Sequence, residues 1–176
     1  YSKGVCRDMM TNKAWVHIHP KYQNQELPFL IPSALIIKNN RIFHFEDTRT
    51  HYPENSLYHL KSALVLAANR HLDDPLLTPY RNAVRLKNSN QFPAFIQTCA
   101  IYFLAGVLGE IRKQLRERFP GFGALPDDYM AINLAIPVED AQQPVISRLY
   151  HRILCESWPP FPSLTVIVEV LVPLSL

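Results

Sequence analysis

The sequence of 176 residues predicts a mixed α/β fold. Short stretches in which apolar and polar residues alternate open the chain, and this pattern is typical of half-buried strands. Longer stretches repeat apolar residues at helical spacing. A helical stretch near the end separates two nearly continuous apolar runs, as in parallel strands that a helix connects.

The composition favours a packed domain. Apolar residues make up 48% of the chain and charged residues 19%, so there are enough apolar side chains for a core. The net charge of +3 is modest and the basic residues are scattered, apart from a cluster at 112–118, so we expect no nucleic-acid partner. Cys6, Cys99 and Cys155 lie far apart without CxxC spacing, which argues against a disulfide framework or zinc site and indicates a reducing, cytoplasmic location.

Two β-hairpins are predicted at the start. Residues 2–7 and 14–19 alternate on either side of a polar turn. Residues 34–37 and 41–45 form the second pair around Asn39-Asn40, because asparagine tolerates the positive φ that a tight turn needs.

The middle of the chain is predicted to be largely helical. Residues 54–70 repeat apolar side chains at helical spacing, with Ser56 as the N-cap. Residues 73–90 are polar and contain two prolines, so we predict a loop or an insertion there. The longest helix is predicted from Pro93 to residue 119, where a Pro-Gly-Phe-Gly sequence ends it.

The last third reads as strand, helix, strand. The predicted strands are 129–136 and 164–172, both apolar enough to be covered on two faces, and the helix is 141–158 with an early interruption at Pro144. The apolar run at 164–172 also predicts a surface that needs cover, and hence self-association.

Residues 92–109 are apolar enough to be tested as a membrane span, and a basic cluster follows them. The helical spacing continues past Glu110 into the charged residues, and Pro93 stands where a soluble helix would begin. We therefore predict a long buried helix and no membrane partner.

Familiar catalytic and metal motifs are absent from the sequence. The five glycines form neither GxxxxGK[ST] nor GxGxxG, and there is no GxSxG sequence. His17 and His19 fall on one face of a strand, but no third metal ligand lies at a recognisable spacing, so we expect a solvent-facing row on an edge hairpin. The residues alone indicate an α/β domain and no specific chemistry.

The order of several segments carries a resemblance. Tyr1-Ser2, the first hairpin, Ile31-Pro32-Ser33, a helix with Lys61, a long helix and a strand ending at Pro137 follow one another. This order resembles the first lobe of the actin and DnaK-type heat-shock chaperone ATPases. The resemblance implies an actin-like, ribonuclease H-like lobe over residues 1–176, with a mixed sheet, an N-terminal hairpin and flanking helices.

The resemblance also implies roles for individual residues. Tyr1 and Ser2 match the last two residues of the family's first phosphate loop, and are the expected nucleotide-binding residues. Lys61 matches the lysine that contacts the terminal phosphate and the attacking water, where an ammonium stabilises the charge of the transferred group. Taken alone, a lysine such as Lys61 is more often a solvated helix residue, and the register of the neighbouring segments is what brings the catalytic interpretation level with that one.

Three further residues are implied with less support from the sequence. Pro137 matches the switch proline that relays nucleotide state, and Gln143 stands where the chaperones have a basic relay residue. Glu169 matches a metal-shell glutamate, although Val170 follows it where the family has proline.

The function implied is that of an ATPase that binds ATP and Mg²⁺ between two lobes. The glycines of the first phosphate loop and the second lobe are not among these residues, so we expect an incomplete lobe that is inactive alone and binds no cofactor. The alternative is a non-catalytic actin-like scaffold or adaptor for a protein client or partner subunit, which Gln143 and the 73–90 segment favour. An unrelated α/β interaction domain stays open as a third hypothesis.

Overall fold

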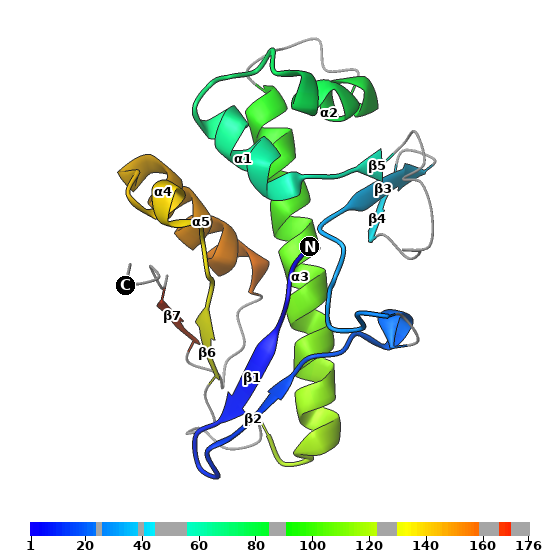
Figure 1. The fold of residues 1–176 in the computed structure, drawn as a ribbon, viewed down its shortest axis with the longest axis vertical. Coiled ribbons are helices and arrows are strands. Elements are labelled where there is room, and N and C mark those ends of the chain that lie inside the picture. The colour runs from blue at the N-terminus through cyan, green and yellow to red at the C-terminus, as the bar shows by residue number, and fades with distance from the viewer. Residues whose placement is uncertain are drawn as a thin grey trace.

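The computed structural model describes residues 1–23, 26–38, 41–44, 56–84, 91–122, 130–158 and 166–169. A single long helix, α3 (Gln91–Arg118), forms the axis of the molecule, and the other elements pack around it (Figure 1). Small sheets and helices are mixed along the chain, which confirms the predicted α/β class.

The first hairpin is confirmed. Strands β1 (Val5–Asp8) and β2 (Lys13–Val16) are antiparallel, with Val5 opposite Val16. In the turn, Asp8 Oδ1 accepts the Met10 N–H and Asn12 adopts φ 55°, a left-handed conformation that asparagine tolerates.

The second hairpin is confirmed in β3 (Leu35–Lys38) and β4 (Arg41–His44), and its turn residues lie outside the described residues. A third strand, β5 (Ser56–Leu57), pairs antiparallel with β3 and was not predicted. Antiparallel ladder bonds with β3 give residues 56 and 57 an alternative to helical bonding.

The predicted helix at 54–70 was therefore wrong at its start. Ser56 is a strand residue and not an N-cap, and α1 (Leu60–Ala68) begins later, after His59 at φ 54°. Residues 54 and 55 lie outside the described residues. The pairing of β5 with β3 overrides the local helical pattern, which continues correctly from Leu60 onward.

The predicted loop at 73–90 contains regular structure. A 3₁₀ turn, η2 (Pro75–Leu77), leads into a short helix, α2 (Thr78–Ala83). Asp74 caps this turn, since its Oδ1 accepts the Leu76 N–H at 2.9 Å. The prolines lie in first turns, where the missing N–H costs no hydrogen bond, so they start helical structure there and do not break it. A second 3₁₀ turn, η1 (Pro20–Tyr22), follows the first hairpin.

The final strand–helix–strand unit is confirmed. Strands β6 (Met130–Asn133) and β7 (Val166–Glu169) are parallel, and α4 (Val138–Ala141) and α5 (Pro144–Ser157) connect them. Pro144 occupies the first turn of α5, so it separates two helices where the sequence predicted one interrupted helix.

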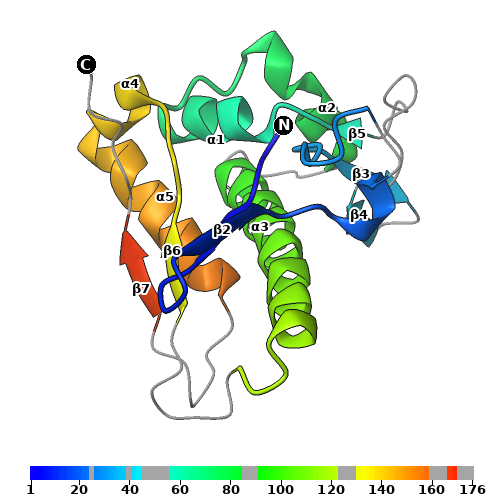
Figure 2. The same cartoon turned by 60° about the horizontal axis from the view of Figure 1, so that its bottom comes forward.

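The core lies where α3 meets α1 and α5 (Figure 2). Its fully buried side chains come from all three helices; they include Leu64, Ile96, Cys99, Ile146 and Ile153. Among the described helices, α3 has the length and apolar content of a membrane span. In this structure α3 packs against α1 and α5, and 39% of its apolar window is buried, so the deeply buried helix stays a prediction.

The side of α3 that faces β4 carries a glycine notch. The His44 ring stacks on Tyr102, with ring centroids 5.0 Å apart, and also contacts Phe103. A Cβ added to Gly106 would lie only 2.0 Å from His44 Nε2, so the absence of a side chain there admits the imidazole. Gly109, three residues later, has open space around it.

We expect Gly106→Ala and Gly109→Ala to have opposite effects on stability. Alanine favours the helix over glycine by about 0.5–1 kcal/mol, so Gly109→Ala should raise the free energy of unfolding by that amount. Gly106→Ala must displace the His44 ring and should lower the free energy of unfolding by about 1–3 kcal/mol. Urea denaturation measures both. Equal stabilisation by the two variants would contradict the close contact of the His44 ring with Gly106.

Candidate functional site

The strand-like approach to the first hairpin is tied to the segment before β3. Ser2 N–H donates to the Ile31 carbonyl at 2.7 Å, and Ile31 N–H donates to the Ser2 carbonyl at 2.8 Å. The hydroxyl oxygens of Ser2 and Ser33 are 2.7 Å apart and hydrogen-bonded. Ser33 was noted only as part of a sequence resemblance, and the structure makes it a direct partner of the predicted nucleotide-binding Ser2.

Lys61 lies near this N-terminal segment. It is the second residue of α1 and is exposed. The charge of Lys61 acts at the backbone nitrogen of Tyr1, so the two residues lie in the same neighbourhood. Figures 1 and 2 show the N-terminal end of the chain beside the first turn of α1. Tyr1, Ser2, Ser33 and Lys61, which we call the Lys61 site, are therefore brought together.

The electrostatics of the Lys61 site favour an anion. The first turn of a helix leaves N–H groups without helical partners and carries the positive end of the helix dipole. His59, at the N-cap of α1, makes no side-chain cap bond, and the first turn contains no acidic residue. Lys61 adds an ammonium at this end, and the Ser2 and Ser33 hydroxyls add groups that hydrogen-bond oxygen atoms.

The predicted switch residues lie elsewhere, at the connection between β6 and α5. Pro137 is exposed, and its carbonyl accepts the Ala141 N–H at 2.9 Å, which starts α4. Gln143 is the N-cap of α5, and its Nε2 donates to the Glu139 carbonyl at 3.5 Å. The hydrogen bonds described for both residues stay within the α4–α5 connection.

Glu169, the predicted metal-shell residue, is the last residue of β7 and pairs with Asn133 of β6. Its side chain is outside the described part of the structure. Within the described residues, no group of three His, Cys, Asp or Glu side chains is arranged to hold a metal ion. A metal role for Glu169 therefore stays a prediction.

The expected solvent-facing row of His17 and His19 was wrong. His17 is only 1% exposed and packs on α3, where its Nδ1 lies 2.7 Å from Gln114 Oε1. The physical reason is Gly4, which hydrogen-bonds His17 across the hairpin. A Cβ at Gly4 would lie 3.1 Å from Ile111 Cδ1, so glycine lets the strand come close to α3. The glycine opposite a histidine was the signal that sequence reasoning missed.

The cysteines differ in environment. Cys99 is buried on α3, and burial raises the pKa of its thiol to about 12. Burial also raises the pKa of the half-buried Cys6. Cys155 is exposed on α5 with its Sγ 3.8 Å from His151 Nδ1.

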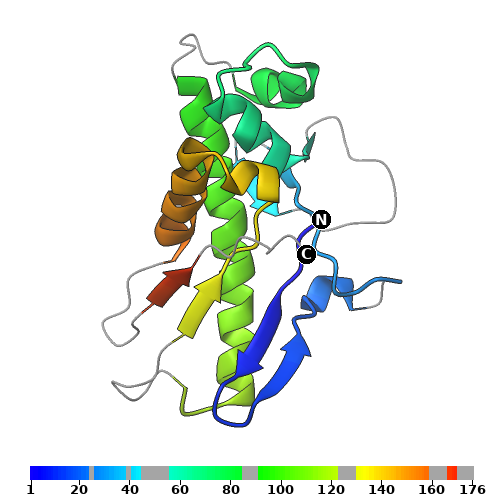
Figure 3. The ribbon, with the colours of Figure 1, turned by 60° about the vertical axis from the view of Figure 1, so that its left-hand side comes forward.

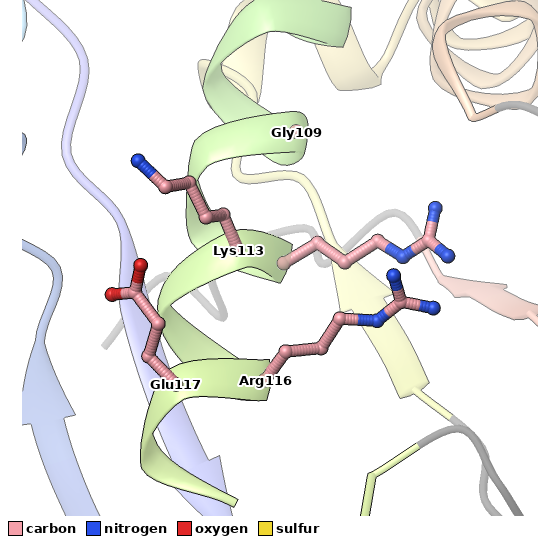
Figure 4. A pocket seen from close by; sticks show the side chains of 5 residues that line it. Gly109, Lys113, Arg116 and Glu117 are labelled. Atoms are coloured by element: carbon pink, nitrogen blue, oxygen red, sulfur yellow. The ribbon is translucent and has the colours of Figure 1, made fainter. Parts of the chain in front are cut away.

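A shallow hollow of about 400 Å³ lies on the charged half of α3 and is lined by Gly109, Arg112, Lys113, Arg116 and Glu117. Burial and the nearby Arg116 charge lower the pKa of Arg112. Figure 4 shows Lys113 and Arg116 leaving the helix in different directions, so these two cations do not converge on one point. We therefore place the candidate site at Lys61 and not in this hollow.

The chain matches no protein-family model, no curated protein and no solved structure. The resemblance to the actin and DnaK-type ATPases is thus a hypothesis that rests on this chain's own residues. The geometry that bears on it is the meeting of Lys61 with Tyr1 and Ser2.

The Ser2–Ser33 hydrogen bond gives a direct test of the geometry of the Lys61 site. Ser2→Ala and Ser33→Ala should each lower the free energy of unfolding by about 1 kcal/mol, because each leaves a half-buried hydroxyl unpaired or removes it. The double variant should cost clearly less than the sum, as measured by urea denaturation in a double-mutant cycle. Ser62→Ala on the exposed face of α1 is the control and should change stability by less than about 0.5 kcal/mol. Additive effects of the two serines would show that they are not partners.

Proposed function

We propose that this chain forms one lobe of an ATP-binding module of the actin and DnaK-type kind, with a further phosphate loop and a second lobe supplied by other residues. One observation carries the proposal. The resemblance assigns phosphate contacts to Tyr1, Ser2 and Lys61 separately, and the charge of Lys61, in the first turn of α1, acts at Tyr1, the neighbour of Ser2.

The chemistry of the Lys61 site suits the terminal phosphates of a nucleotide. Unpaired N–H groups at a helix start bind phosphate oxygens, and an ammonium adds a charge-assisted hydrogen bond. The ammonium of Lys61 on the transferred phosphoryl group would stabilise the charge that develops there during hydrolysis. In this proposal the adenosine is bound by residues other than those described here. Mg²⁺ would arrive bound to ATP and would neutralise part of the negative charge of the phosphates.

The arrangement of the strands supports the same proposal. Strands β2, β1, β6 and β7 lie side by side on one side of α3, yet they form two separate two-stranded sheets (Figure 3). Two-stranded sheets are marginal alone. A strand from the rest of the proposed module, set between β1 and β6, would join them into one mixed sheet over α3.

We further propose that the α4–α5 connection relays nucleotide state to a partner. Strand β6 ends at Asn133 and not at Pro137 as predicted, and Pro137 is exposed directly before α4. Its carbonyl accepts the Ala141 N–H, so a displacement of Pro137 would move the start of α4. Gln143 at the start of α5 carries no charge, and relay through it would rest on its bond to the Glu139 carbonyl.

The alternative is a non-catalytic scaffold of the same fold, acting on a client or partner subunit in the cytoplasm. The outer face of the first hairpin favours it, because Val5, Val16 and Ile18 are 64%, 39% and 41% exposed. Exposed neighbouring apolar side chains are typical of protein contact surfaces. In this reading Lys61 is a surface lysine and the site binds no nucleotide.

ATP hydrolysis by the complete reading frame distinguishes the two functions. In the ATPase, Lys61→Gln should lower kcat on the order of 10²-fold while KM for MgATP changes little, because the lysine acts mainly on the transition state. Lys38→Gln, at the exposed end of β3, is the matched control and should hydrolyse ATP normally.

Calorimetry with MgATP gives the second measurement. We expect no binding heat for the 176 residues alone and binding for the complete frame. Tight MgATP binding by the 176 residues alone would contradict the proposal that a further phosphate loop and a second lobe are needed to complete the nucleotide site. A complete frame that binds no MgATP would leave the scaffold.

A further inference from the structure

The first hairpin is attached to α3 by hydrogen bonds and by ring contacts. Gln114 Nε2 donates to the Ile18 carbonyl at 2.8 Å, which leaves its Oε1 as an acceptor for the His17 Nδ1–H at 2.7 Å. Trp15 lies over the end of the helix, with its ring centroid 6.0 Å from that of Phe119 and the Arg118 guanidinium 4.5 Å away.

This attachment contains two buried atoms without partners. The Nδ1–H tautomer leaves His17 Nε2 as an acceptor, and this atom has no hydrogen bond. Glu110 Oε1, one helical turn before Gln114 on α3, is also buried and unpaired. Each unpaired buried group costs about 1–3 kcal/mol, so these two atoms weaken the attachment of the hairpin to α3.

Two further histidines gather on the same stripe of α3. Gly106, Glu110 and Gln114 are four residues apart and therefore share one helix face. His44 of β4 lies over Gly106, and His19 lies beside His17, with ring centroids 6.3 Å apart. Segments distant in sequence thus place three imidazoles along one side of one helix.

We propose that His17, His19 and His44 form a proton-operated clasp, which holds the N-terminal strands on α3 while the imidazoles are neutral and releases them on protonation. The proposal does not depend on nucleotide binding. A proton is the ligand that fits here, since the described residues offer no third metal ligand.

The charges around the clasp set its direction. Glu110 is the acid whose charge acts on both His17 and His19. On the other side, Lys113 of α3 and Lys21 of η1 repel a proton on His19, and Lys21 and His19 repel one on His44. The positive charges of Lys21 and Lys113 therefore disfavour protonation of the clasp histidines that they face.

Burial is the main cause that lowers the pKa of each of the three histidines below the ordinary 6.5. The Gln114 bond and the Glu110 charge raise the pKa of His17 again, but only in part. Because the released state binds protons more readily, the docked state has its full stability above pH 6.5 and loses it as the pH falls below that value. Each linked proton weakens docking by up to about tenfold per pH unit.

The two tryptophans allow the clasp to be tested in the natural chain. With 5-fluorotryptophan incorporated, Trp15 reports the hairpin and Trp158, buried on the core side, is an internal control. Between pH 8 and 5 the ¹⁹F signal of Trp15 should shift below pH 6.5, while that of Trp158 and the helical circular dichroism stay constant. A Trp15 signal that does not change, or that moves only together with Trp158, would overturn the clasp.

Variants identify the proton sites. His17→Gln keeps a donor for Gln114 Oε1 and cannot titrate, so the pH dependence of the Trp15 signal should fall by about one linked proton. His71→Gln, at an exposed histidine after α1, is the control and should leave the pH dependence of the Trp15 signal unchanged. Equal effects of the two variants would contradict the assignment to His17.

A measurement on the unaltered chain covers the case in which His17→Gln does not fold. Long-range ¹H–¹⁵N spectra of the imidazoles give the tautomer and the pKa of each histidine directly. We expect His17 as the Nδ1–H tautomer with a pKa below 6.5. A His17 that titrates above 6.5 would mean that acid strengthens docking, and would overturn the proposal.

Discussion

The packing of α3 is the constraint on which the rest of this structure depends. A helix of 28 residues with a broad apolar face is unstable in water unless other elements cover that face. Here α1 and α5 cover it over the first half, where Ile96, Cys99 and Phe103 are buried. The charged second half carries the first hairpin through hydrogen bonds and ring contacts instead. One helix therefore carries an apolar core at one end and mixed polar and ring contacts at the other.

This division decides where chemistry is possible. Because α1 is fixed against the apolar half of α3, its first turn and Lys61 have a defined position relative to Tyr1 and Ser2. The same two residues are held by hydrogen bonds to the segment before β3. The hairpin that follows them rests on His17 and Gln114. A site near Lys61 thus combines a rigid helix with an N-terminal segment whose attachment responds to protons.

Sequence patterns predicted the elements whose formation is local. The hairpin, the long helix and the strand–helix–strand unit at the end all carry periodicity or turn residues of their own, and all are present. Errors arose where a distant partner intervened. Ser56 was taken as a helix cap because the pairing that makes it a strand residue involves Ile36, and no local signal shows this. The error at 75–83 has a local cause: Asp74 and the prolines that start these two short helical elements are also the residues typical of a loop.

The sequence by itself determined most of the helices and strands, because side-chain periodicity and turn residues act over a few positions, but it missed β5 and the helical structure at 75–83. It also named Lys61, Tyr1 and Ser2, but as separate residues. Only the tertiary structure decided that Lys61 lies near Tyr1, that Ser33 hydrogen-bonds Ser2 and that His17 is buried. Such outcomes depend on how closely two surfaces approach. At Gly4 and Gly106 that approach is set by a missing Cβ, whose effect is visible only once α3 lies opposite.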